Sequence, residues 1–433
     1  MKRKELLKQL IVTSQETLSM EVEQRGVELP LHTGKIITVT GVRRCGKSCL
    51  FTLAIKQLLA EGVDRRKILF LNFDDERLQF DREGFDEILD AYRELYADIP
   101  MNEVYMFFDE IQMADSWEQF VRRVYDQETR NLFITGSNSK MLSSEIATSL
   151  RGRTLQFEVF PLSFKEFCIF RKVDTNYYVT TNRAPLLNLF YDYLRYGAFP
   201  EVVMGDSRFR EQMLQEYFFV MLYKDLVERY NIRNPAPVRY FIKRILANIT
   251  KPTSINKLYN ELKSQGVTVG KNTLYELIEQ IEAIYLLLPL TKYDPSLVKE
   301  NSADNKYYCI DNGLRGALLA SHGEDNGALL ENLVYLYLRR YLPFGRGLFY
   351  FKGKRECDFL ITDKQEVSSL IQVSWDISEP ETKKREIDGL LEAATATGCS
   401  RLLIITAEAE EEITIGNMKI EILPAWKWML ESR

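Results

Sequence analysis

The stretch TVTGVRRCGKSCLFTLA, from Thr38 to Ala54, places a glycine, four variable residues and then Gly-Lys-Ser between an apolar run and a helical period. Its centre, from Gly41 to Ser48, matches the phosphate-loop pattern, and a strand before and a helix after it are the context that this pattern requires. Glycines let the backbone wrap closely around an anion, and the N–H groups at the start of a helix stabilise negative charge. The stretch therefore predicts a binding site for the phosphates of a nucleotide.

Two side chains of this loop have expected roles. Lys47 is expected to reach the β- and γ-phosphates, and the Ser48 hydroxyl is expected to bind Mg²⁺. The residues expected to contact the nucleotide are Gly41, Arg43, Arg44, Cys45, Gly46, Lys47, Ser48 and Cys49. The helix start and the nearby Lys and Arg also predict a lowered pKa for the Cys45 thiol. The alternative is that this cysteine is a small residue that fits the loop.

Short apolar runs alternate with amphipathic stretches from residue 36 to about residue 160. The runs are KIITVT, KILFLNFDD, EVYMFFDE and NLFITGS. Strands that are apolar on both faces and alternate with helices are typical of a parallel sheet covered on both sides. The sequence therefore predicts an α/β fold of the P-loop type over residues 1–165.

Two acidic residues end the run VYMFFDE. An acid at the carboxyl end of a neighbouring strand can hold the Mg²⁺ shell, and the next acid can polarise the attacking water. Asp109 is therefore the expected magnesium residue, and Glu110 is the expected general base. The alternative for the pair by itself is an Asp that caps a helix and a Glu in the first turn.

Two further segments offer residues for the γ-phosphate. In LFITGSNSKML, Ser137 and Asn138 follow a buried strand, and Asn138 is the preferred candidate for sensing the phosphate and orienting the water. In SLRGRTLQFEVF, Arg151 and Arg153 are candidates to stabilise transition-state charge, in this subunit or in a neighbouring one. Ordinary surface charges are the alternative for both arginines.

The remaining chain divides into three regions by its pattern. Residues 166–250 are predicted to be helical, and residues 251–325 to form helices followed by a strand pair, which indicates a winged-helix-like region and connector. Residues 326–433 are predicted to form a second, small α/β domain. The helix that would enter a DNA groove carries Glu276, Glu279 and Glu282, which oppose a phosphate backbone. Domain packing therefore competes with weak DNA binding as the role of this region.

Several segments together resemble a known family. They are TGVRRCGKS, FFDEIQ, TGSNSKML, LRGR followed by FPLSFKEF, and later YGAFPEVV and YKDLVERYNI. This ordered set resembles prokaryotic AAA-type ATPases whose C-terminal half is an uncharacterised domain, and which are related to the archaeal ATPases. The resemblance implies an ATPase core, a helical and winged-helix middle, and a C-terminal domain like restriction endonucleases. It also implies ATP rather than GTP, and no NKxD-type guanine motif is visible.

The endonuclease-like resemblance implies a second metal site. Such folds place acids on a first helix and on a hairpin strand, and a lysine on the next strand assists the attacking water. The candidate ligands are Glu331, Asp358 and Gln372, and Glu356 points to the same strand face as Asp358. Ser374 stands where active nucleases have the lysine, so the domain is expected to be catalytically degenerate and to serve binding or regulation.

Composition limits the remaining function classes. The net charge of −5 does not favour general DNA binding, which would need a local basic face. Six scattered cysteines and two histidines do not indicate a zinc cluster or a disulfide framework. No apolar run is long enough to cross a bilayer, and the basic start lacks a signal-peptide core, so a cytoplasmic protein without a membrane partner is expected.

The sequence thus predicts an ATPase that requires ATP and Mg²⁺. The protein is expected to work as a nucleotide-driven switch or motor, with nucleic acid as the favoured target. An ATP-dependent signalling or scaffold protein with a protein partner is the alternative, and an ATP-coupled DNA nuclease is the second alternative. The oligomeric state stays open, because the arginine that completes the site can come from either subunit of an oligomer.

Overall fold

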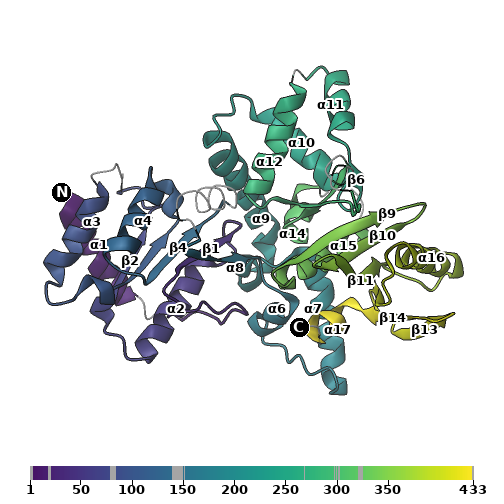
Figure 1. Ribbon diagram of the computed structural model, residues 1–433, viewed down its shortest axis with the longest axis horizontal. Helices are drawn as coiled ribbons and strands as arrows, with labels where there is room; N and C mark the ends of the chain where they lie inside the picture. The colour runs from purple at the N-terminus through teal and green to yellow at the C-terminus, as the bar shows by residue number, and fades with distance from the viewer. Residues whose placement is uncertain are drawn as a thin grey trace. The chain divides into compact units, whose positions relative to one another are not determined.

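The computed structural model describes residues 3–17, 21–78, 84–138, 150, 152–267, 269–296, 298, 300, 303–319 and 325–431. It divides into two compact units (Figure 1). The first contains Met1–Phe160 with Ala283–Tyr285, and the second contains Pro161–Glu282 with Leu286–Arg433. Among the helices of these ranges, none is both long enough and apolar enough to span a membrane.

The first unit is built on a five-stranded parallel sheet. Its strands are β1 (Ile36–Gly41), β2 (Ile68–Asn72), β3 (Tyr105–Asp109), β4 (Leu132–Gly136) and β5 (Thr154–Val159), in the order β2-β3-β4-β1-β5. All neighbouring strands pair in parallel, which confirms the predicted parallel sheet. The four predicted runs form β1 to β4. The edge strand β5 was not predicted, because its sequence TLQFEV alternates polar and apolar residues.

Helices cover both faces of this sheet. They are α1 (Arg3–Thr17), α2 (Lys47–Ala60), α3 (Gly84–Leu95) and α4 (Trp117–Gln127), with short 3₁₀ turns η1 (Arg65–Lys67), η2 (Met101–Glu103) and η3 (Ile111–Met113). Successive strand residues point to opposite faces. Phe107 of β3 contacts Phe51 of α2, whereas the next residue, Phe108, contacts Phe120 of α4. The core therefore has two halves, one on each side of the sheet.

The second unit begins with a helical region. It contains α6 (Phe164–Phe170), α7 (Thr180–Tyr196), α8 (Pro200–Met204), the 3₁₀ turn η5 (Ser207–Phe209), α9 (Arg210–Val220), the π-helix η6 (Met221–Glu228) and α10 (Pro235–Ala247). A capping box begins α6, because the Ser163 hydroxyl accepts from the Glu166 N–H and the Glu166 carboxylate accepts from the Ser163 N–H. The helices that the sequence predicts for this region are therefore present.

A small antiparallel sheet follows α10. Its strands β6 (Pro252–Thr253), β7 (Leu287–Leu290) and β8 (Asn305–Cys309) lie in the order β6-β8-β7, and α11 (Ile255–Ser264) and α12 (Lys271–Ala283) come between β6 and β7. The apolar residues that recur at helical spacing along α12 are all buried: Leu274, Leu277, Ile278 and Ile281. This sheet matters for the site below because β8 carries Lys306.

The chain ends in a six-stranded mixed sheet. The elements are α14 (Asn312–Leu318), α15 (Asn326–Tyr341), β9 (Arg346–Lys352), β10 (Glu356–Asp363), β11 (Glu366–Val373), α16 (Pro380–Thr397), β12 (Leu402–Thr406), β13 (Glu411–Ile415), β14 (Met418–Pro424) and α17 (Ala425–Glu431). The strand order is β13-β14-β12-β11-β10-β9. Strands β11, β12 and β14 run parallel, and the other pairs are antiparallel. The predicted α/β character of this end of the chain is therefore present.

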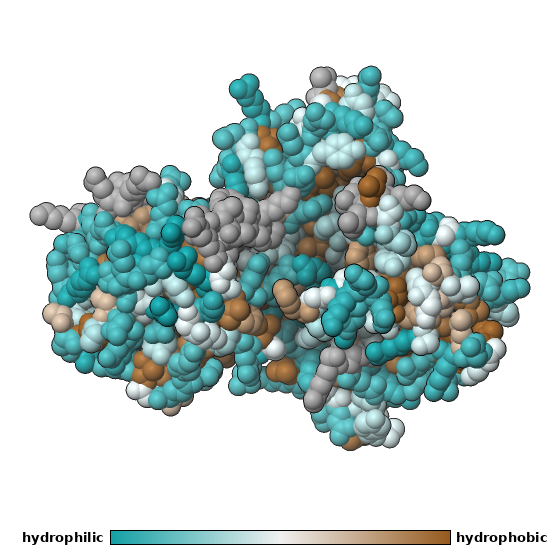
Figure 2. All heavy atoms as spheres, viewed as in Figure 1, coloured by the Kyte–Doolittle hydropathy of each residue, from teal (hydrophilic) through white to brown (hydrophobic). Residues whose placement is uncertain are grey.

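The surface follows from this packing. On the face shown in Figure 2, hydrophilic residues cover most of the helices of the first unit. The side chains of Phe107 and Phe108 of β3 are buried against helices on both sides of the sheet, whereas Leu155 of the edge strand β5 is exposed.

Candidate active site

The loop between β1 and α2 depends on two glycines. Gly41 ends β1 with a φ of 154°, and a Cβ atom on it would lie 2.1 Å from the carbonyl oxygen of Val159 on β5. Gly46 immediately precedes α2 and has a φ of 99°. Any residue with a side chain would be strained in this conformation. The glycine spacing of the sequence therefore has a steric reason at both ends of the loop.

Lys47 lies across this loop. Its side chain is only 3% exposed, and Nζ donates to the carbonyl oxygens of Gly41 at 3.1 Å and Val42 at 3.2 Å. It also lies 3.3 Å from Oε1 of Glu110. Burial alone would lower the pKa of this amine, but the nearby Glu110, Cys45 and Asp109 outweigh burial and raise the pKa. The loop therefore holds a charged ammonium at its centre.

Asp109 reaches the loop from β3. The Ser48 hydroxyl donates to Oδ2 of Asp109 at 2.6 Å, and the Thr135 hydroxyl donates to Oδ1 at 2.5 Å. Strand β4 lies between β1 and β3, so Asp109 approaches from the next strand but one rather than from the adjacent strand that the sequence analysis assumed. Burial raises the pKa of Asp109. A hydroxyl and a carboxylate side by side are hard oxygen ligands of the kind that Mg²⁺ prefers, so these residues fit the expected ion.

Glu110 is held by three contacts. Its backbone has a φ of 51°, an uncommon conformation outside glycine, and its N–H donates to the Thr135 hydroxyl at 2.9 Å. Oε1 faces Lys47, and Oε2 accepts from the Gln112 amide at 2.5 Å. Burial raises the pKa of this carboxyl, but Lys47 and then Gln112 lower it to about 2 overall. Glu110 is therefore ionised and directed into the loop.

The end of β4 completes this group of residues. In the parallel register Thr40 lies beside Gly136, so Ser137 and Asn138 follow at the same edge of the sheet as the loop. Both side chains are buried. Ser137 Oγ lies 3.4 Å from the Gln112 amide nitrogen, so Gln112 links the end of β4 to Glu110.

Sequence analysis missed Gln112 and Arg25. Gln112 follows the acidic pair in FFDEIQ, and that polar position after the strand is the signal that marks it. Its Oε1 is buried and has no hydrogen-bond partner within the described residues. Arg25 donates to the carbonyl oxygens of Cys45 at 2.6 Å and Phe160 at 3.0 Å, and so supports the loop from outside. No local pattern marks Arg25, which lies in an irregular segment.

The other predicted loop residues differ in exposure. Arg43 is paired with Asp74 at 3.3 Å, while Arg44 is exposed with a φ of 66°. The predicted lowering of the Cys45 pKa is wrong: this thiol is fully buried, and burial raises its pKa although Lys47 and Arg25 act in the opposite direction. Cys49 is exposed on α2.

The structure does not bring Arg153 to the loop of its own chain. Arg153 immediately precedes β5, and its carbonyl oxygen accepts from Ile36, the first residue of β1. Gly41 and the phosphate loop lie at the other end of β1. The alternative in which Arg153 acts on the nucleotide of its own subunit is therefore wrong. Its guanidinium pairs with Asp126 at 3.3 Å and lies over the Tyr125 ring. The other candidate, Arg151, lies outside the described residues.

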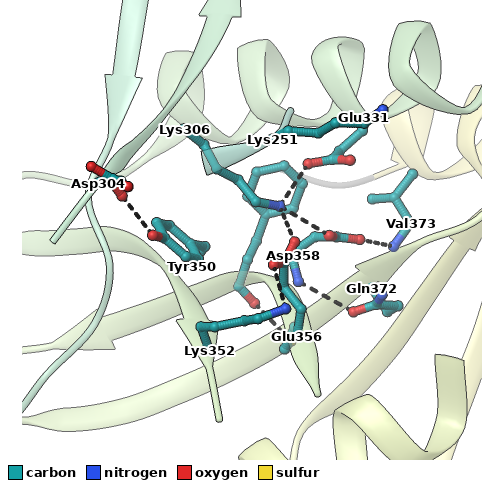
Figure 3. Close-up of polar contacts among 12 residues, drawn as sticks. Lys251, Asp304, Lys306, Glu331, Tyr350, Lys352, Glu356, Asp358, Gln372 and Val373 are labelled. Atoms are coloured by element: carbon teal, nitrogen blue, oxygen red, sulfur yellow. Dashed lines mark hydrogen bonds and ion pairs between the residues drawn. The ribbon is translucent and has the colours of Figure 1, made fainter. Parts of the chain in front are cut away.

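A second polar centre lies in the other unit (Figure 3). Glu331 of α15 and Asp358 of β10, two of the predicted metal ligands, both contact Nζ of Lys306, at 3.1 and 3.2 Å. Glu356 of β10 contacts the same nitrogen at 2.8 Å. The third predicted ligand, Gln372, accepts the Asp358 N–H with Oε1 and donates to Glu386 at 2.6 Å. The structure thus places an ammonium where the sequence predicts a metal ion, and no cluster of three His, Cys, Asp or Glu in the described part of the chain is arranged to hold one.

Comparisons with known proteins agree with the geometry of the first site. Residues 33–168 match the family described as AAA domain, and residues 187–325 match a domain of unknown function, DUF8612. The first unit is thus an AAA-type domain of the P-loop nucleotide-binding ATPase class.

Similarity along nearly the whole chain shows the particular family. The chain is 36% identical over 423 residues to the uncharacterized protein MJ1544 of Methanocaldococcus jannaschii, covering 95% of this chain and 91% of the relative, and it belongs to the same family. An uncharacterized protein of Haemophilus influenzae is 29% identical, over 92% of this chain and 95% of that protein. Among solved structures, AMPPCP-bound DnaA from Aquifex aeolicus has 11% identity and a TM-score of 0.27, over 65% of this chain and 88% of that one.

Proposed function

We propose that the protein binds ATP with Mg²⁺ at the β1–α2 loop and hydrolyses it. The observation that carries this proposal is the 2.6 Å contact between Ser48 and Asp109 beside the buried ammonium of Lys47. These three side chains, with the glycine loop and the start of α2, supply the metal ligands, the cation and the backbone donors that a triphosphate needs. Arg43, Arg44, Cys45 and Cys49 complete the loop that surrounds the phosphates.

The chain's own residues divide the chemistry between them. Ser48 and Asp109 would hold Mg²⁺, which would supply positive charge to neutralise the phosphates during transfer. Lys47 exchanges its present partners, Glu110 and two loop carbonyls, for the β- and γ-phosphates. This exchange frees Glu110 to accept a proton from the attacking water.

Two amide side chains are placed to orient that water. Gln112 holds Glu110 with its Nε2, and its buried Oε1 is available to accept a hydrogen bond from the water. Asn138 at the end of β4 serves as the γ-phosphate sensor. The arginine that completes the transition state comes from a neighbouring subunit in this proposal, because Arg153 lies at the opposite edge of its own sheet.

Hydrolysis and binding variants test the roles separately. Glu110→Gln is expected to lower the ATP hydrolysis rate about 100-fold or more while ATP affinity is retained. Glu118→Gln, an acid of the first turn of α4, is the matched control and should hydrolyse ATP at the normal rate. Equal rates for Glu110→Gln and the unsubstituted protein would refute the assignment of the base.

We further propose that the ATPase acts on nucleic acid as a switch or motor. The order β6-α11-α12-β7-β8, with its three-stranded sheet, supports a winged helix over residues 251–325 after the helical region 166–250. The order α15-β9-β10-β11-α16-β12 supports an endonuclease-like fold over residues 326–433. Stimulation of ATP turnover by DNA would support a nucleic-acid target. Indifference to DNA would favour the alternative, a signalling or scaffold protein with a protein partner.

A DNA nuclease is the second alternative. Ser374 immediately follows β11, and the family resemblance places the lysine of active nucleases at this position. Nicking of plasmid DNA with Mn²⁺ that disappears in Asp358→Ala would be needed to support it.

A further inference from the structure

The carboxylate centre of the second unit is filled by a side chain from another sheet. Lys306 comes from β8 of the three-stranded sheet, whereas Glu331 comes from α15, and Glu356 and Asp358 come from β10 of the six-stranded sheet (Figure 3). The Lys306 side chain is only 1% exposed. Its nitrogen lies 5.5 Å from the centre of the Tyr350 ring, which supports the charge from one side.

The contacts saturate the ammonium. A lysine ammonium has three N–H donors and no acceptor. Lys306 makes one contact with each of three carboxylates, at 3.1 Å to Glu331, 2.8 Å to Glu356 and 3.2 Å to Asp358. No N–H remains to hold a water or a phosphate oxygen. Lys306 therefore does not supply the water-assisting lysine that position 374 lacks.

The carboxylates are held in place by other donors. Oδ2 of Asp358 accepts from the Val373 N–H at 3.0 Å, and Oε2 of Glu356 faces Lys352 at 3.2 Å. The Tyr308 hydroxyl donates to Oε1 of Glu331 at 2.8 Å. In this way each acid directs one oxygen to a common point, as the ligands of a metal ion do.

We propose that the Lys306 ammonium takes the place of a divalent cation in this centre, so that the native protein keeps the carboxylate geometry and binds no metal there. Metal–oxygen distances are about 2.0–2.6 Å, shorter than the 2.8–3.2 Å from the nitrogen. Small movements of the three acids would therefore convert the lysine site into a metal site once the lysine is removed. The inference does not depend on ATP binding, because all of these residues belong to the second unit.

Binding of Mn²⁺ to the full chain, followed by electron paramagnetic resonance, tests the proposal. All proteins carry Asp109→Asn, which removes the expected metal ligand of the first unit. The parent should show no Mn²⁺ bound at the second centre, while Lys306→Ala should bind one Mn²⁺ per chain, with an affinity at least about tenfold above the weakest binding that the assay detects. Lys352→Ala is the matched control, because Lys352 pairs with the same Glu356 but is 47% exposed, and it should behave as the parent.

The outcomes separate clearly. Loss of the new site in Lys306→Ala/Asp358→Asn would support the proposal, because it places the ion among these carboxylates. If Lys306→Ala is unfolded in a chelator, Mn²⁺ should restore its circular dichroism spectrum, and failure to do so would overturn the proposal. A folded Lys306→Ala that binds no Mn²⁺, or a parent that binds Mn²⁺ and loses it with Asp358→Asn, would also overturn it.

Discussion

Replacing Lys306 with methionine should destabilise the second unit strongly. The substitution keeps a similar apolar stem but removes the buried cation that Glu331, Glu356 and Asp358 share, and it leaves three acidic side chains facing one another. Breaking a buried ion pair by removing one partner costs about 3–5 kcal/mol. Lys352→Met removes a half-exposed partner of Glu356 and should cost about 1 kcal/mol or less.

Urea unfolding followed by tryptophan fluorescence measures the difference. Of the four tryptophans, Trp375, Trp426 and Trp428 belong to the second unit, so the signal reports mainly on that unit. The cost of Lys306→Met should shrink as the pH falls from 9 to 5, because protonation first of Glu331, whose pKa is raised to about 8, and then of the other acids relieves the repulsion among them. Equal destabilisation by Lys306→Met and Lys352→Met would refute the reasoning that the first lysine is a buried structural cation.

Three further predictions follow from the contacts. Burial and the nearby Asp358 raise the pKa of Glu331 from 4.5 to about 8, so between these pH values the folded chain keeps a proton that the unfolded chain loses. The free energy of unfolding should therefore fall as the pH rises from 4.5 to 8, by at most about 1.4 kcal/mol per pH unit. Urea titrations of Glu331→Gln should lack this slope. A thiol-alkylating reagent should modify exposed Cys49 about tenfold or more faster than buried Cys45, as peptide mapping would show; equal rates would contradict the buried thiol. Gln112→Ala should lower ATP turnover roughly tenfold or more without weakening ATP binding, and a normal turnover would remove Gln112 from the site.

The parallel sheet could be predicted because its information is local. Four strands are continuous apolar runs, and the phosphate loop is one segment whose residues Gly41 to Ser48 stay together in space. Asp109 and Glu110 could be placed because polar residues that end parallel strands meet at one edge of the sheet.

The errors concern properties that depend on the tertiary structure. Arg153 is the last residue of the segment LRGR, but the unpredicted strand β5 that follows it begins beside the start of β1, so this arginine lies away from the loop. The Cys45 pKa depends on burial, which the neighbouring charges in the sequence do not reveal.

Lys306 shows the same limit in the second unit. It lies in the segment DNKYYCID, and nothing in that segment indicates that its side chain reaches carboxylates 25 to 52 residues away. The sequence analysis grouped Glu331 and Asp358, and the structure does bring them together. It assigned a metal ion to them because nothing in the sequence indicates that a lysine from a different sheet lies between them.

Calorimetric titration of the protein with ATP, with and without Mg²⁺, tests the central claim most directly. The account predicts magnesium-dependent binding that Lys47→Ala weakens about 100-fold or more, since its buried ammonium would no longer meet the phosphates. Lys56→Ala, in the same helix α2, is the matched control and should bind ATP normally. ATP affinity that is absent, or that is unchanged in Lys47→Ala, would contradict the account.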